Sequence, residues 1–187
     1  VCSLTTAPDG RVWGGTFPSA TLFSYDPETD KTQNFGRMDP DQFYCYPTAG
    51  GDGLIYCAIQ FEKFDIVVFD PEKGTKTALI PPEERKAGRV HLMRGTDGKV
   101  YGRFSTRERW FRIEGKEGLK EFSESSMPLP PKALPDGRRF SLVDNNLLLI
   151  EDLLKEEKKE IPLTYEAAGA FVFVVGRGPD DRVYGSS

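Results

Sequence analysis

Asp9-Gly10-Arg11-Val12-Trp13-Gly14 is a short phrase that recurs five times in the 187 residues of the chain. A copy has an aspartate at a turn, a variable residue, a hydrophobic residue, an aromatic ring and a small residue. The later copies follow at intervals of 43, 45, 39 and 44 residues, starting at Asp52, Asp97, Asp136 and Asp180. A fixed period of this length indicates a repeat architecture in which each repeat is one unit of supersecondary structure.

The period and the pattern inside each repeat predict the fold class. Short apolar runs bounded by Gly, Pro, Asn and Asp predict strands, and a repeat of this length with four strands is a β-propeller blade. We expect four strands in each of the first three repeats, three clear strands in the fourth and two in the fifth. The prediction is an all-β chain, a partial β-propeller in a single domain over 1–187, with blades over 1–37, 44–81, 89–124, 129–165 and 168–187.

The repeats resemble a known superfamily. The Asp-Gly turns followed by a hydrophobic and an aromatic residue, and the strand ends Tyr25-Asp26-Pro27 and Phe69-Asp70-Pro71, resemble the propellers that include the quinoprotein-like, six-bladed lactonase-like and kelch-like groups. The resemblance covers nearly all of the chain and implies the fold without selecting a subfamily. Propellers close with roughly 4 to 8 blades, so we expect a partial ring: a fragment, a chain cut by an insertion, or a half that pairs with another copy.

The shared positions of the repeat predict packing rather than chemistry. The aromatic ring and the small residue after it recur, so we expect the rings to fill the space between stacked blades and the small residues to admit them. Two of the three cysteines, Cys2 and Cys45, stand where Val90 and Phe173 stand in later copies, which predicts core packing. An odd, sparse cysteine count argues against a disulfide framework.

No motif in the chain indicates a metal or a cofactor. There is no C-x-x-C pair and only one histidine, so we predict no metal site. Lactonase-like propellers use a Glu, Asn and Asp set, and the candidates Asp41, Glu62 and Asp144 lack a matching Asn motif. The chain has two tryptophans, too few for a quinone-docking motif in every blade. The sequence therefore does not select a cofactor.

Charge and hydropathy exclude two classes of partner. The net charge is −4 and the basic residues are scattered, which is unlike a nucleic-acid-binding surface. No apolar run approaches the roughly 18 residues of a membrane span. The chain has the composition of a soluble protein. Because it starts at Val1 inside a strand pattern, we expect a processed or excised piece, and export stays open.

The residues that differ between copies are the candidates for function. The resemblance implies that the loops before the first strand and after the second strand of each blade surround a channel and bind ligand. At equivalent positions near this channel the copies carry Ser3, Tyr46, His91, Pro130 and Val174. His91 can act as a general base, Tyr46 as the acid, and Arg94 as the neutraliser of a carboxylate. We expect ligand-binding roles for Tyr44, Arg89, Arg37, Arg103 and Phe17.

Each candidate also has a structural interpretation. A lone histidine at a strand start is commonly a hydrogen-bonded structural residue, and Tyr46 can be a packing residue. Arg94 has a counterpart in Arg177, which suggests a repeated structural ion pair.

Three functions fit these patterns. The first is a propeller module that binds a ligand or partner, carbohydrate-facing and bacterial in style. The second is an enzyme, a lyase that acts on uronate-containing polysaccharide with His91, Tyr46 and Arg94 as base, acid and charge neutraliser. The third is a structural half-ring that completes a larger or dimeric assembly. Enzyme status is left open.

Overall fold

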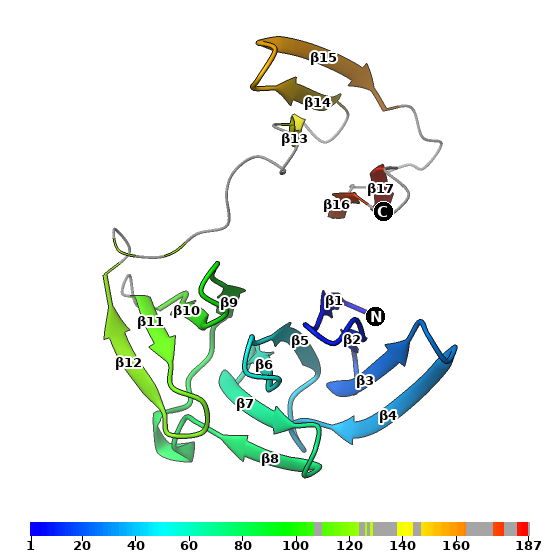
Figure 1. The fold of residues 1–187 in the computed structure, drawn as a ribbon. Helices are drawn as coiled ribbons and strands as arrows, with labels where there is room; N and C mark the ends of the chain where they lie inside the picture. Colours follow the sequence, from blue (N-terminus) through cyan, green and yellow to red (C-terminus); the bar gives the residue numbers. More distant parts are fainter. Residues whose placement is uncertain are drawn as a thin grey trace. The chain divides into compact units, whose positions relative to one another are not determined.

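The chain was analysed as a computed structural model, which describes residues 1–106, 110–123, 126, 128, 138–143, 147–163, 174–177 and 183–186 (Figure 1). The chain divides into two compact units, Val1–Pro130 and Pro131–Ser187. Each unit is described by itself. The single domain over 1–187 stays a prediction.

Three four-stranded antiparallel sheets make up the first unit, and their strands pair in chain order. The first sheet contains β1 (Ser3–Thr6), β2 (Val12–Gly15), β3 (Thr21–Asp26) and β4 (Lys31–Arg37). The second contains β5 (Tyr44–Ala49), β6 (Ile55–Gln60), β7 (Asp65–Asp70) and β8 (Thr75–Ala78). The third contains β9 (Val90–Arg94), β10 (Val100–Phe104), β11 (Trp110–Ile113) and β12 (Leu119–Phe122). The four strands expected in each of the first three repeats are therefore present.

Two further sheets are described in the second unit. One has three strands, β13 (Arg138–Val143), β14 (Leu147–Asp152) and β15 (Glu157–Pro162), at the places predicted for the fourth blade. The other pairs β16 (Val174–Arg177) with β17 (Val183–Ser186), as predicted for the fifth. The first strand expected in the fourth blade, within 127–135, lies outside the described residues apart from Pro128. The predicted all-β propeller class is confirmed.

A short 3-10 turn, η1 (Pro82–Glu84), follows the last strand of the second blade. Among the described residues, no helix is long and apolar enough to cross a membrane.

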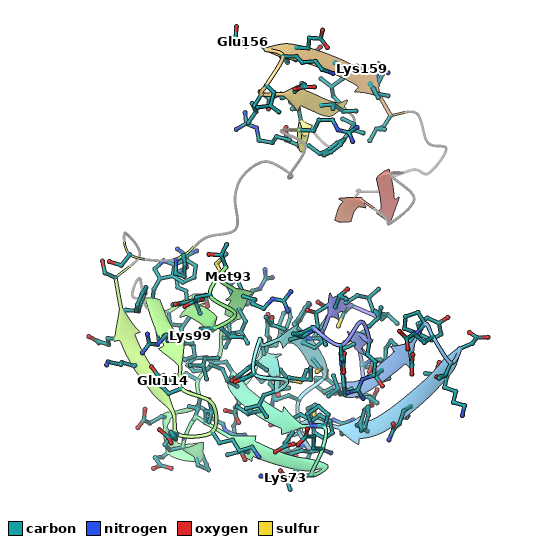
Figure 2. All side chains as sticks on the ribbon, viewed as in Figure 1. Lys73, Met93, Lys99, Glu114, Glu156 and Lys159 are labelled. Carbon is teal, nitrogen blue, oxygen red and sulfur yellow. The ribbon has the colours of Figure 1, made fainter. Side chains whose placement is uncertain are left out.

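The sheets of the first unit pack face to face around their first strands. Figure 1 shows β1, β5 and β9 innermost, with β4, β8 and β12 at the outer edge. Side chains fill the space between successive sheets (Figure 2). Both middle strands of the second blade, β6 and β7, are buried along their whole length. One apolar cluster joins the first blade to the second and another joins the second to the third. The second blade is therefore covered on both faces.

The repeated aromatic residues are core residues, as predicted. Trp13, Tyr56 and Tyr101 are each at most 2% exposed. The ring of Trp13 stacks on Phe35 and meets Phe69 of the second blade, with centroid distances of 5.0 and 6.0 Å. The counterpart Phe140 is half-buried, and nothing is described of the side chain of Tyr184.

The aspartate that opens the repeat has a role that the sequence pattern did not reveal. The hydroxyl of Tyr56 donates to Asp52 at 2.6 Å, and that of Tyr101 donates to Asp97 at 2.7 Å. Burial, and then the carboxylate of Asp52, raise the pKa of Tyr56, so this hydroxyl stays protonated and donating. In the second and third repeats, the bond between the aspartate and the tyrosine four residues later therefore ties the turn to the second strand of the same blade.

Small residues beside the rings admit close neighbours. A Cβ on Gly14 or Gly102 would lie within 2.6 Å of the ring of Phe23 or Phe111, its partner on the next strand of the same blade. These glycines thus make room for a ring of their own blade, whereas the prediction had named the rings between blades. Gly15 has a different reason to be glycine, because a Cβ there would collide with the main-chain carbonyl of Cys45 in the next blade. Cys45 and Cys57 are buried free thiols, in line with the predicted packing role.

The tyrosine–aspartate bond predicts a measurable share of stability. Tyr56→Phe removes a hydrogen bond to a charged acceptor, so the free energy of unfolding should fall by about 1.5 kcal/mol. The matched control is Tyr25→Phe, whose hydroxyl donates to Asp30 at an exposed site and whose loss should leave stability unchanged. Urea unfolding of the three proteins measures this, and equal effects of the two substitutions would contradict the proposed role of this bond.

Candidate ligand-binding site

A hollow of about 380 Å³ lies in the first unit, where β1, β5 and β9 begin and β6 ends. We call it the inner hollow. Twelve residues line it: Ser3, Tyr44, Tyr46, Pro47, Thr48, Ala58, Gln60, Phe61, Arg89, Val90, His91 and Leu92. Three of them, Ser3, Tyr46 and His91, are the equivalent positions of successive blades singled out in the sequence. Four candidate site residues, Tyr44, Tyr46, Arg89 and His91, therefore share one hollow.

A stack of aromatic rings stands beside the inner hollow. The ring of Tyr44 stacks on Phe17 at 4.4 Å and on Phe61 at 4.7 Å, and it lies nearly parallel to Tyr46 at 6.0 Å. We call Phe17, Tyr44, Tyr46 and Phe61 the aromatic array. Phe17 and Phe61 are 52% and 44% exposed. The two outer rings of the array are thus partly open to solvent, unlike the rings of the core.

Main-chain hydrogen bonds hold the loops that carry the array. Phe61 has φ of 97°, a strained value for a residue with a side chain. Two hydrogen bonds with Gly88 keep it there, from Phe61 N to Gly88 O at 3.0 Å and from Gly88 N to Phe61 O at 2.8 Å. The loop of Phe17 is tied by Ala20 N donating to Phe43 O at 2.9 Å. Residues with strained backbone angles are often found at functional sites.

A buried ion cluster lies behind these loops. The guanidinium of Arg85 contacts the carboxylates of Asp39, at 3.2 Å, and Asp65. The two aspartates are at most 4% exposed. Asp39 also accepts hydrogen bonds from the main chain of Asp41 and Gln42, and Asp65 accepts them from Ile66 and Ile80. The cluster therefore joins the loop before β5, strand β7 and the segment after β8.

Burial raises the pKa of Asp65, although the neighbouring main-chain N–H groups and Arg85 act in the opposite direction. In the folded protein, the ionised form of Asp65 is therefore favoured by its hydrogen bonds and by the cation beside it, against the effect of burial.

Arg37 does not line the inner hollow and instead binds the loop before β5. Its guanidinium donates to Asp39 O at 3.1 Å and to Gln42 O at 2.8 Å. The amide oxygen of Gln42 in turn accepts from Lys63 N at 3.2 Å, which links this loop to the one that carries Phe61. The structure thus places Arg37 where it shapes the loops.

Arg89 is the cation at the edge of the inner hollow. Its guanidinium lies 5.6 Å from the ring centre of Phe61, within the range of a cation–π contact. Its main chain is paired with Ser105, whose hydroxyl accepts from Arg89 N and whose N–H donates to Arg89 O, both at 2.9 Å. None of the ion pairs among the described residues involves Arg89.

Gln60 and Tyr46 add neutral polar groups to the lining. The amide of Gln60 donates to Val90 O at 2.8 Å, which fixes the side chain between the second and third blades. Burial, and then the neighbouring Cys2 and Tyr44, raise the pKa of Tyr46. Its hydroxyl is therefore a proton donor rather than a base.

Arg94 lies away from the inner hollow, at the far end of β9 from His91. It lines a second hollow, and its Nη1 donates to Thr6 O at 3.4 Å and to Ala49 O at 3.3 Å. These partners are main-chain carbonyls rather than the carboxylate of the expected ion pair.

Arg103 stands opposite His91 across the strand pair β9 and β10. Its guanidinium lies 5.4 Å from the ring centre of Trp110 on the next strand of the same blade. Arg103 lines neither hollow.

Sequence reasoning missed three contributors to the site. Gln60 ends strand β6 and Phe61 begins the loop after it, which was expected on the channel face, although neither residue was selected. Gly88 pairs with Phe61. The separation of His91 from Arg94 had a signal in the sequence. The two are three residues apart on an extended strand, a span of about 10 Å, so they were poor candidates to act on the same atoms. Within the described residues, no group of three His, Cys, Asp or Glu side chains is placed to hold a metal.

Solved structures share this fold. Virginiamycin B lyase from Staphylococcus aureus aligns with a TM-score of 0.52 at 15% identity, over 98% of this chain and 61% of that one. A catalytically inactive form of the same lyase, solved with quinupristin, gives the same values. YCF48 bound to D1 peptide aligns with a TM-score of 0.49 at 12% identity, over 90% of this chain and 52% of that one.

The fold is therefore that of a β-propeller, and the chain spans 61% of the length of the lyase that it matches. No protein-family model matches the chain, and no curated protein is significantly similar to it in sequence.

The ion cluster predicts a pH-dependent loss of stability. Arg85→Met leaves Asp39 and Asp65 buried without their cation, and the free energy of unfolding should fall by about 3 kcal/mol near neutral pH. Removing the cation raises the pKa of Asp65 further. The deficit should therefore be small at acid pH, where the carboxyl is protonated, and should grow as the pH rises through that pKa.

Denaturant unfolding of wild type and variant across the acid range measures this deficit. Arg112→Met is the control, because its pair with Glu114 is partly exposed and should contribute little. A deficit that stays constant with pH would contradict the role of the Asp65 carboxylate.

Proposed function

We propose that the first unit is a ligand-binding propeller module that takes a carbohydrate at the inner hollow. The aromatic array is the observation that carries this proposal. Exposed rings cost hydration free energy unless a partner covers them. Phe17 and Phe61, the exposed rings of the array, stand on loops that main-chain hydrogen bonds hold in place. Such rigidity favours a preformed site.

The lining of the inner hollow supports a carbohydrate ligand. Small-molecule sites combine aromatic walls with a few fixed polar groups. Phe61, which is exposed and lines the hollow, supplies an aromatic surface for the C–H side of a sugar ring. Gln60, Tyr46 and Arg89 supply polar groups for its hydroxyls. A likeness at 15% identity supports the fold alone, so the ligand is argued from the lining residues.

Carbohydrate binding should depend on the array. Phe61→Ala removes an exposed stacking face and should weaken binding of a glycan identified by array screening about tenfold. Phe43→Ala is the matched control, since Phe43 is 43% exposed but takes part in neither the array nor the lining. Calorimetric titration compares the three proteins. A glycan screen with no signal, or equal losses in both variants, would contradict the proposed function.

A second candidate is a lyase that acts on uronate-containing glycans. The observation in its favour is that His91, Tyr46 and Arg89 line the same hollow. In this reaction the base His91 takes the proton on the carbon next to the carboxylate, and the C–O bond to the leaving sugar breaks as a C=C bond forms. Tyr46 gives its proton to the departing oxygen. In this proposal Arg89, which lines the hollow, takes the role of charge neutraliser in place of Arg94.

The lyase is tested by incubating the protein with acidic polysaccharides and following the ultraviolet absorbance of the unsaturated product. Activity that falls at least about a hundredfold in His91→Ala fits a general base. Activity that is the same in wild type and His91→Ala would remove His91 as the base, and no activity on any acidic polysaccharide would leave binding as the function.

A further inference from the structure

A second hollow, of about 720 Å³, lies at the opposite ends of the same inner strands. We call it the far hollow. All three blades of the first unit contribute to it, through Thr5, Thr6, Pro8, Thr48, Gly51, Arg94, Gly95, Thr96 and Gly98. Thr48, next to the last residue of β5, lines both hollows. The two hollows are therefore adjacent along the inner strands.

Arg94 is held across the far hollow by its two bonds to main-chain carbonyls. The carbonyls belong to Thr6 and Ala49, which occupy in the first two blades the position that Arg94 occupies in the third. A guanidinium has five N–H donors, and both of these bonds use Nη1 alone. The side chain is thus fixed in place while Nε and Nη2 keep donors for a further partner.

The carboxylates near the far hollow are already engaged. Asp52 accepts the hydroxyl of Tyr56 and the N–H of Leu54, and Asp97 accepts the hydroxyl of Tyr101. In the described part of the chain, no ion pair involves Arg94. The far hollow therefore holds a cation without a carboxylate partner.

The inner hollow repeats this arrangement at the other end of β9. Arg89 lines it without an ion pair in the described residues, and none of its twelve lining residues is acidic. The lining of the far hollow, too, includes no acidic residue. This contrasts with the chain as a whole, whose net charge is −4. Both ends of the inner strands thus favour a negatively charged group.

We propose that the two hollows form one groove that binds an acidic oligosaccharide lengthwise, with one carboxylate at Arg89 and another at Arg94. The proposal rests on carbohydrate binding at the inner hollow and adds the charge and the length of the ligand. The two arginines are five residues apart on an extended segment, a span of about 17 Å. A single sugar ring is too short for this span, so only an oligomer of several units contacts both cations.

The experiment is a calorimetric length series. Galacturonate and its oligomers of increasing length are titrated into the protein, together with galactose oligomers of the same lengths. The wild type should bind the long acidic oligomers about tenfold more tightly than the monomer, and this gain should shrink at high salt. Neutral oligomers should show no such gain.

Arg94→Met tests the far cation, because it keeps much of the aliphatic length and removes the charge. The ratio of long-chain to monomer affinity should fall to about one. A purely structural clamp would instead lower the melting temperature and leave this ratio unchanged, which would overturn the proposal. Should the variant fail to fold, the wild-type length series still decides: an affinity for acidic chains that does not rise with length overturns the groove.

The outcomes separate the two proposals. Equal binding of neutral and acidic oligomers would overturn the acidic groove and leave the carbohydrate site in place. No binding of any carbohydrate would overturn both.

Discussion

Apolar packing between neighbouring blades is the interaction on which the rest of the first unit depends. A flat sheet that is apolar on both faces is stable only when both faces are covered. The second blade meets this condition, since β6 and β7 are buried throughout between the two apolar clusters. The same packing brings the first strands of the three blades next to one another. Gly15 shows how close this approach is, because a Cβ there would meet the backbone of Cys45. The inner hollow follows from that spacing.

The fold could be predicted from the sequence because its signals are local and repeated. Each Asp-Gly turn, apolar run and proline stop marks an element, and the period gives the blade. The site was predictable only in part. Tyr46 and His91 hold equivalent positions in neighbouring blades, so equivalence alone brings them together. Phe61 could not be found this way, because its position depends on a bridge to Gly88, 27 residues later. Arg94 was assigned by its charge, whereas its place at the far end of β9 separates it from His91.

The chemistry of the inner hollow depends on rigidity supplied from behind it. Arg85 joins two buried carboxylates in different segments, and Gln42 links the loop before β5 to the loop after β6. Through these contacts the loops of Phe17, Tyr44 and Phe61 are fixed before any ligand arrives, so little ordering entropy is lost on binding. Arg94 has a corresponding place at the far hollow, where it bonds to two of the three inner strands and belongs to the third.

The most direct test of this account is residue-resolved mapping of ligand contact by NMR on the isotope-labelled chain. On titration with an acidic oligosaccharide, the amide shifts that change should cluster at the start of β5, at Phe61 and at Arg89–Leu92. They should extend along the inner strands to Arg94 as the ligand lengthens. Shifts confined to the outer strands β4, β8 and β12, or no shifts with any carbohydrate, would contradict the central claim that the inner hollow is the binding site.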